Sequence, residues 1–396
     1  MGITTLSRRA DDIVSNLKVM AAHEIAFVGG GLNSAIGNVH RIASQMDGRF
    51  SLVGGCFSRN PQTNAATAEN WGIATRRVYT DVLDLIDAEQ GRLDAVAVLT
   101  PVFSHAPIIT ALIEKGFNII SEKPLVSDLD EVNRLQSALL RTGGRLLVTF
   151  NYTGYPMIRE LQERIRRGDF GVIKHIRSTM QQESFVKRDA QGNYIPPQSW
   201  RLEDRTIPTV SLDLGMHVVH LQQFLVPDAP ISVLSRMDSF GAFPEVVDDV
   251  DIMYRCKGGL YVHGWWSKSA AGHANGLSVE VFGSEGSARW VQMEPELLRL
   301  RNTTGVESAI HRGTAACMVA SQPRYNRFKA GHPDGFIEAF ANTYNDIATE
   351  FFEADEDNRK ETVVADFSIQ QSKLLLSLLQ GAVDSVKTRS EVRLAL

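Results

Sequence analysis

Apolar and polar positions alternate in blocks over about the first 150 residues of the chain. Short runs that are apolar throughout are followed by segments whose apolar residues recur at helical spacing. The apolar runs occupy residues 24–29, 50–57, 94–99, 118–121 and 146–150, and the helical segments about 35–46, 62–71, 104–115 and 129–140. Apolar strands that alternate with helices indicate a parallel sheet covered on both faces. We therefore expect a doubly wound α/β domain.

The pattern changes after about residue 155, where strand-like runs follow one another and Gly and Asn turns separate several of them. We expect strands at residues 231–237, 250–256, 260–266, 277–282 and 288–291, and helices at 156–167, 216–224 and 335–353. Consecutive strands of alternating polarity predict an α+β domain with an open-faced, largely antiparallel sheet. A last helical pattern over residues 368–386 is expected to return onto the first domain.

Composition removes several classes of function. The 396 residues are 43% hydrophobic and carry a net charge of −5, so the chain has no general attraction for nucleic acid or an anionic membrane. No stretch approaches the roughly 20 consecutive apolar residues that span a bilayer. The three cysteines lie far apart, so we expect no disulfide framework and no metal site, and a cytoplasmic location. The polar residues 1–22 are interpreted as an N-terminal arm.

The first apolar run ends in the glycine-rich stretch GGGLNSAIG, after which the first helix begins. Glycines at such a turn let the backbone approach a pyrophosphate, whose charge is stabilised by the helix N-terminus. Gly29 and Gly31 match the G-x-G-x-x-G fingerprint, whereas Gly37 comes three residues late. A plain strand-to-helix turn is the alternative. The position after the first strand favours a dinucleotide cofactor, with Leu32 and Asn33 as further contacts.

The end of the second apolar run bears on the choice between NAD and NADP. An NAD-selective domain usually places an acidic residue there, against the ribose 2′-hydroxyl. This chain has Ser58 and Arg59 instead, which suit the 2′-phosphate of NADP. An exposed surface arginine is an equally good interpretation of Arg59. We expect NAD or NADP as the cofactor, with a slight preference for accepting NADP.

Two further polar clusters lie at chemically useful places. Glu122 and Lys123 follow an apolar run, at a strand end where open α/β sheets bind ligands. Asp213 and His217 are four residues apart, so on a helix they share a face and the carboxylate can orient the imidazole. Each cluster also has a plain structural interpretation, a turn for the first and a helix cap with a packed histidine for the second.

Taken in order along the chain, these motifs resemble the glucose-fructose oxidoreductase/inositol dehydrogenase/MocA family. The motifs are Thr100-Pro101-x-x-x-His105, Glu122-Lys123-Pro124 and Asp213-x-Gly215-x-His217. The resemblance runs from residue 24 to about 349. It implies a Rossmann domain over residues 23–152, an α+β substrate and oligomerisation domain over 153–366, and a C-terminal helix over 367–396 that packs on the Rossmann domain. Val102 departs from the family, in which Asn is common at this position.

The resemblance also implies an NAD(P)-dependent oxidoreductase that acts on a hydroxyl-bearing carbon of a sugar, sugar derivative or cyclitol. Lys123, Asp213 and His217 are then the catalytic set, and Thr100, Pro101, His105 and Glu122 join the cofactor contacts. In alcohol oxidation His217 suits the general base, and Lys123 suits stabilisation of the alkoxide. Asp213 would orient His217. His220 is expected to be structural.

Three more residues are candidates for the substrate side of the site. Trp200 and Arg201 belong to a loop over residues 185–207 that is rich in Lys, Arg and Pro, and Tyr152 stands at the junction of the two domains. The alternatives are a surface excursion for the loop and plain interdomain packing for Tyr152.

Two other functions are compatible with the same motifs. One is an NAD-dependent glycosidase that oxidises its substrate transiently, and the other is a non-catalytic dinucleotide sensor. The joint presence of the three catalytic candidates favours the dehydrogenase. We also expect a homodimer or homotetramer through a five- or six-stranded sheet, with apolar material from Tyr261, Trp265, Trp266 and Trp290.

Overall fold

The computed structural model describes residues 21–353 and 367–394. Its N-terminal part contains a parallel sheet with strand order β2-β1-β3-β4-β5, five strands within the described residues. Most of their side chains are buried, as continuous apolar runs predict. The five expected strands are confirmed, as β1 (His23–Gly29), β2 (Phe50–Cys56), β3 (Ala95–Leu99), β4 (Asn118–Ser121) and β5 (Arg145–Val148).

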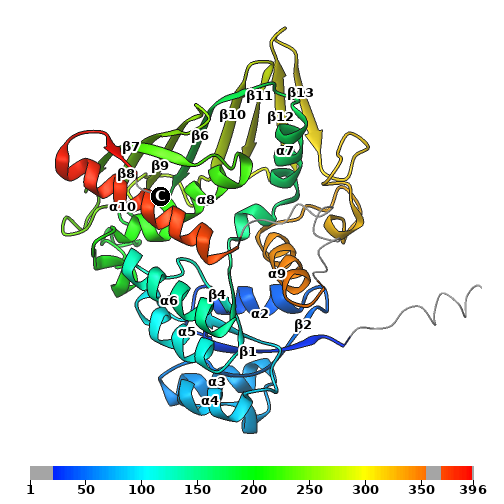
Figure 1. Cartoon of the computed structure of the whole chain (residues 1–396), viewed down its shortest axis with the longest axis vertical. Coiled ribbons are helices and arrows are strands. Elements are labelled where there is room, and N and C mark those ends of the chain that lie inside the picture. Colours follow the sequence, from blue (N-terminus) through cyan, green and yellow to red (C-terminus); the bar gives the residue numbers. More distant parts are fainter. Residues whose placement is uncertain (1–20, 354–366, 395–396) are drawn as a thin grey trace, which may run out of the picture.

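Helices connect these strands and cover the sheet (Figure 1). Side-chain caps begin several of them: Asn60 accepts a hydrogen bond from the amide of Thr63, and Asp128 from the amide of Glu131. The helices are α2 (Gly37–Gln45), α3 (Pro61–Trp71), α4 (Val82–Glu89), α5 (His105–Glu114) and α6 (Leu129–Thr142), with short 3-10 turns η1 (Thr75–Arg77) and η2 (Val102–Ser104).

The second sheet has nine strands within the described residues, in the order β13-β12-β11-β10-β6-β9-β8-β7-β14. Its neighbours pair antiparallel except β6 and β9, which are parallel. The prediction of five or six strands was wrong. It omitted the outer strands β12, β13 and β14, which are polar or short, and the central strand β6, whose few apolar residues are separated by polar ones. The strands are β6 (Ile173–Gln181), β7 (Pro230–Asp238), β8 (Asp249–Cys256), β9 (Tyr261–Ser267), β10 (Ser278–Gly283), β11 (Gly286–Val291), β12 (Leu297–Asn302), β13 (Glu307–His311) and β14 (Val392–Arg393).

Among the described residues, helices contact this sheet and lie on one face of it (Figure 1), as expected for an open-faced sheet. These helices are α7 (Pro156–Arg167), α8 (Met216–Leu225) and α10 (Ile369–Thr388). Trp266 and Trp290 are fully buried, and the Trp266 indole donates to the hydroxyl of Ser211 at 3.2 Å. Tyr261 and Trp265, by contrast, are only partly buried. Trp266 and Trp290 are therefore core residues of the helical face, which corrects the expectation that all four aromatic residues are available for assembly.

Two helices contact both halves of the chain. The helix α10 packs against β7 of the second sheet and against α6 and β5 of the first, and the amide of Val148 donates to the carbonyl of Phe367. The helix α9 (Phe336–Phe352) lies along α2, where His40 Nδ1 is 2.7 Å from the hydroxyl of Tyr344 (Figure 1). The remaining helical elements are η3 (Asn151–Gly154), η4 (Ser199–Leu202), the π-helical turn η5 (Ser211–Gly215) and η6 (Pro323–Tyr325).

Within residues 21–353 and 367–394, no helix has the length and apolar character needed to cross a membrane. The predicted N-terminal arm, apart from residues 21 and 22, lies outside the described residues.

Candidate active site

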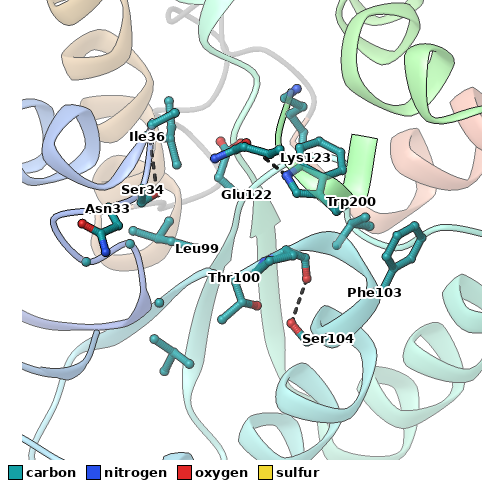
Figure 2. Close-up of a pocket in the computed structure, with 18 of the residues that line it drawn as sticks. Asn33, Ser34, Ile36, Leu99, Thr100, Phe103, Ser104, Glu122, Lys123 and Trp200 are labelled. Atoms are coloured by element: carbon teal, nitrogen blue, oxygen red, sulfur yellow. Dashed lines mark hydrogen bonds between the residues drawn. The ribbon is translucent and has the colours of Figure 1, made fainter. Parts of the chain in front are cut away.

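A cleft of about 970 Å³ lies at the carboxyl ends of the strands of the parallel sheet. Its walls come from the glycine turn after β1, the ends of β2, β3 and β4, and η3, η4, η5, α8 and α9. Figure 2 shows Asn33, Ser34 and Ile36 on one side of this cleft and Lys123 and Trp200 on the other. The two domains therefore share one site.

The glycine turn leaves room for the backbone of the cleft wall to contact a ligand. Gly29 and Gly30 adopt φ angles of +83° and +74°, which disfavour any residue with a Cβ. A Cβ on Gly31 would lie 3.0 Å from the carbonyl oxygen of Phe57. Gly29, Gly31 and Asn33 line the cleft. Glycines at this place fit the close approach of a pyrophosphate.

Gly37 and Leu32 lie outside the lining of the cleft. A Cβ on Gly37 would lie 1.6 Å from the carbonyl oxygen of Gly30, so Gly37 lets α2 pack directly on the turn. Leu32 is 45% exposed. The late glycine thus has the packing role of the third fingerprint glycine without contacting the cleft.

The end of β2 lines the cleft with Ser58 and Arg59, the residues that the sequence singled out for a 2′-phosphate. The Ser58 hydroxyl accepts a hydrogen bond from the amide of Asn60. Among the described residues that line the cleft, Asp213 and Glu122 are the acidic ones, and neither follows β2. Among the described residues, the part of the cleft wall that follows β2 therefore contains no carboxylate.

Thr100 and Pro101 line the cleft, whereas His105 is buried behind them. The His105 ring lies 2.7 Å from the carbonyl oxygen of Thr100 and 3.1 Å from those of Pro124 and Leu125. His105 therefore ties the loop after β3 to the loop after β4, and in this way it supports the cleft from outside.

Glu122 and Lys123 follow β4 and both line the cleft. The Glu122 carboxylate accepts a hydrogen bond from Thr149 Oγ1 at 2.5 Å and lies 3.3 Å from His40 Nε2. Burial opposes its ionisation, but His40, Lys123 and Thr149 outweigh burial and hold the pKa of Glu122 below its usual value. A charged Glu122 therefore stands beside Lys123.

The carboxylate of Asp213 joins the two domains. It accepts hydrogen bonds from Lys268 Nζ at 2.6 Å, from Lys123 Nζ at 3.1 Å and from Arg201 Nε at 3.1 Å. Lys123 Nζ also donates to the main-chain carbonyl of Asp213 at 2.8 Å. Burial opposes ionisation, yet the three cations hold the pKa of Asp213 well below its usual value.

Asp213 does not bind His217, contrary to the expectation that it orients the imidazole. Its carboxylate is engaged by three cations, which form stronger bonds with it than a neutral ring would. His217 Nδ1 is buried and has no hydrogen-bond partner among the described residues. The motif also begins in the π-helical turn η5, so only His217 belongs to the α-helix proper.

His217 lines the cleft against the aromatic ring of Tyr152, which it meets edge-on with ring centres 4.6 Å apart. Burial, and after it the charge of Lys123, holds the pKa of His217 well below its usual value. Tyr152 lines the cleft too, and its hydroxyl accepts a hydrogen bond from Asn275. His220 stacks on Phe150 with ring centres 3.8 Å apart, outside the lining of the cleft.

Trp200 and Arg201 also line the cleft, in the short turn η4. The guanidinium of Arg201 lies 4.7 Å from the centre of the Trp200 ring. Further along, the guanidinium of Arg205 lies 3.5 Å from the ring centre of Phe103, which belongs to η2 of the first domain. This segment therefore spans the cleft from one domain to the other.

Sequence reasoning missed Lys268, Asn151, Phe336 and Phe340. Lys268 is buried behind Asp213, and its only local signal is its place directly after the apolar strand β9. Asn151, Phe336 and Phe340 line the cleft, the last two from α9. Among the described residues no group of three or more His, Cys, Asp or Glu side chains is placed to hold a metal ion.

A parallel sheet with a glycine turn, joined across a cleft to an open-faced sheet, is the architecture of an NAD-binding oxidoreductase of two domains. Residues 23–150 match the family model of oxidoreductases with an NAD-binding Rossmann fold, and residues 158–289 match the GFO/IDH/MocA C-terminal domain. The chain belongs to the GFO/IDH/MocA family.

Several relatives are similar over most of the chain. An uncharacterized oxidoreductase of Bacillus subtilis, YfiI, is 26% identical over 81% of this chain and 83% of its own length. Levoglucosan dehydrogenase of Pseudarthrobacter phenanthrenivorans is 27% identical over 58% of this chain and 62% of its own. A solved inositol dehydrogenase homolog from Azotobacter vinelandii, complexed with NADH and myo-inositol, is 25% identical, with a TM-score of 0.84 over 94% of this chain and 98% of that one.

Proposed function

We propose that the protein transfers a hydride between a nicotinamide cofactor and a hydroxyl-bearing carbon of a sugar, sugar derivative or cyclitol. The observation that carries the proposal is the meeting of Lys123 from one domain with Asp213 and His217 from the other in a single cleft. Relatives named for inositol and for levoglucosan support the class of substrate. The substrate's remaining polar groups would be held by the second domain.

In the oxidation direction the substrate hydroxyl loses a proton and its carbon loses a hydride. The bound cofactor supplies the hydride acceptor. His217 is buried and neutral, so it accepts the proton at a ring nitrogen. Lys123 donates to the reacting oxygen and stabilises its negative charge, while Asp213 holds the ammonium of Lys123 in place. In the reverse direction the same proton returns to the oxygen.

The test is a panel of sugars, anhydrosugars, inositols and glycosides, with NAD or NADP, followed at 340 nm. Nicotinamide reduction in step with substrate loss is expected, and it should be strongly reduced in Lys123→Met and His217→Ala. Release of an aglycone without net NADH would instead identify a glycosidase. Binding without turnover across the panel would contradict a dehydrogenase and favour a sensor.

The residues at the end of β2 lead to a proposal on cofactor choice. With no acidic side chain beside Ser58 to repel a phosphate, NADP should be accepted alongside NAD, and Arg59 should pair with the 2′-phosphate. Arg59→Ala should weaken NADP binding about 10-fold or more while NAD binding changes little. Fluorescence titration with both reduced cofactors measures the ratio. An unchanged ratio of the two affinities would contradict the proposed contact.

A further inference from the structure

The charges around Asp213 do not balance. Three cationic side chains, Lys123, Lys268 and Arg201, donate to its one carboxylate. Glu122 is the other acidic residue among the described residues that line the cleft, and it lies beside Lys123. Among the described residues, these two carboxylates are the ones that bind the three cations or line the cleft beside them, so one positive charge is left without a carboxylate to offset it. An uncompensated charge in a part-buried site favours a ligand of the opposite sign.

The surplus charge belongs to Arg201. Lys268 is buried behind Asp213, and Lys123 stands between Asp213 and Glu122. Arg201 donates a hydrogen bond from Nε to the carboxylate of Asp213 and another from Nη1 to the side-chain oxygen of Gln198. Its Nη2 has no hydrogen-bond partner among the described residues. The Arg201 side chain is 26% exposed and lines the cleft. It therefore presents a free, charged donor to whatever occupies the cleft.

Arg201 is also held in place before any ligand binds. Its guanidinium lies against the ring of Trp200, whose indole N–H donates to the same Gln198 side chain at 3.1 Å. The segment is anchored on the other domain by Arg205, which lies over Phe103. A donor fixed in this way loses little conformational entropy when it binds an anion.

The cofactor does not supply the missing negative charge at this place. The glycine turn would hold the pyrophosphate of a dinucleotide and Arg59 the 2′-phosphate of NADP, and Figure 2 shows the turn residues Asn33 and Ser34 across the cleft from Trp200. An oxidised nicotinamide adds a further positive charge. The pKa of Lys268 reflects the same surplus: burial lowers it to about 8, and both Arg201 and Lys123 act in the same direction while Asp213 opposes them.

We propose that the substrate carries an anionic oxygen group, a carboxylate or a phosphate, and that Arg201 binds it. The inference rests on the proposed dehydrogenase function and narrows it to acidic or phosphorylated sugars and cyclitols. Arg201 then sets specificity, while Lys123 and His217 act on the hydroxyl that is oxidised.

Matched substrates test the proposal. Each neutral compound is compared with its carboxylate and its phosphate, for example glucose with glucuronate and glucose 6-phosphate, galactose with galacturonate and galactose 6-phosphate, and myo-inositol with its monophosphates. We measure kcat/KM with NAD and NADP, and the affinity of the protein–NADH complex for each compound. At least one anionic compound should exceed its neutral counterpart about 10- to 100-fold in both measurements. The two anionic arms show whether carboxylate or phosphate is preferred.

Arg201→Gln should abolish that preference, and Arg201→Lys should restore part of it. The readout is the ratio of kcat/KM for the anionic compound to kcat/KM for the neutral one. An indirect effect through Asp213 lowers both values and therefore leaves this ratio unchanged. Arg188→Gln is the matched control, because Arg188 lies on the same excursion, is exposed and stacks on Tyr194 instead.

Two results would overturn the proposal. The first is that every neutral compound is turned over as well as or better than its anionic counterparts. This result would exclude an anionic substrate and would still support the proposed dehydrogenase activity. An anionic preference that survives in Arg201→Gln would remove Arg201 from this role. Absence of turnover with every compound would count against the dehydrogenase itself, and the affinities of the NADH complex would still decide whether anions are preferred.

Discussion

The neutrality of His217 determines how it can serve as a base. Burial and Lys123 lower its pKa, so the ring is neutral at and above the ordinary histidine pKa of about 6.5 and gains a proton only at lower pH. The stability that comes from its neutral form is therefore present above about pH 6.5, and it declines as the pH falls below that value, where the unfolded chain takes up the proton first.

Replacing His217 should reveal its role. His217→Ala should reduce kcat by roughly 10²- to 10⁴-fold, with cofactor binding retained, because proton transfer to a positioned base contributes about that much. In the unaltered protein the acid limb of the pH profile that belongs to His217 should lie below about pH 6.5. His220→Ala is the control, since His220 stacks on Phe150 outside the cleft.

The control is expected to lower the melting temperature while kcat is kept. An unchanged kcat in His217→Ala together with a large loss of kcat in His220→Ala would show that His220, and not His217, is the general base.

Lys268 is a positioning residue that acts through Asp213. Its ammonium makes the shortest of the three hydrogen bonds to that carboxylate, at 2.6 Å, and it does not line the cleft. Lys268→Met should leave Asp213 less well fixed and lower kcat about 10- to 100-fold, with a smaller change in KM. The unaltered protein should lose activity as the pH rises through about 8, where Lys268 loses its proton.

That alkaline limb should be absent in Lys268→Met, a difference that a merely structural role would not produce. Lys257→Met, at an exposed lysine, serves as the control. An unchanged pH profile in the Lys268 variant would contradict the positioning role.

At the scale of elements, the packing of α2 on the glycine turn after β1 depends on one glycine. A Cβ at residue 37 would overlap the carbonyl oxygen of Gly30, so Gly37→Ala has to move α2 away from the turn. We expect a loss of roughly 1–3 kcal/mol in the free energy of unfolding, together with weaker cofactor binding. Chemical denaturation and NADH titration measure the two effects.

Asn38→Ala, at the next and exposed position of the same helix, should change neither quantity by much. A Gly37→Ala variant with normal stability and normal NADH affinity would show that the turn adapts to a side chain.

At the scale of the whole molecule, the open face of the nine-stranded sheet is the natural surface for assembly. Leu234 is 39% exposed there, close to Met253 and Trp265 around one hollow of this face. We expect a homodimer or homotetramer that buries this surface. Light scattering should give a mass at least twice the 43.8 kDa of one chain.

Leu234→Asp should reduce the mass toward that of one chain, because it places a charge in the buried interface. Leu140→Asp is the control, since Leu140 is 80% exposed on α6 of the other domain. A monomer at micromolar concentration in the unaltered protein would exclude assembly under these conditions.

Much of the molecule follows from local pattern. The five parallel strands, the glycine turn and the position of Lys123 were predictable, because apolar runs mark buried strands and parallel strands present their carboxyl ends at one edge. Their four-residue spacing singled out Asp213 and His217, and the family motifs gave them catalytic roles. The outer strand β13 was missed because a strand that is exposed on both faces carries no apolar alternation. The central strand β6 was missed too, because polar residues dominate its sequence IKHIRSTMQ.

The local sequence pattern could not predict which partners the charged residues of the cleft bind. Lys123 meets Asp213 across 90 positions of sequence, and Lys268 meets it across 55. Local reasoning paired Asp213 with His217, its neighbour on a helix. The tertiary structure instead brings three cations to the carboxylate, Lys123 from the first domain and Arg201 and Lys268 from distant elements of the second. Charged groups bind the strongest partners within reach, and that reach is set by how distant elements pack together.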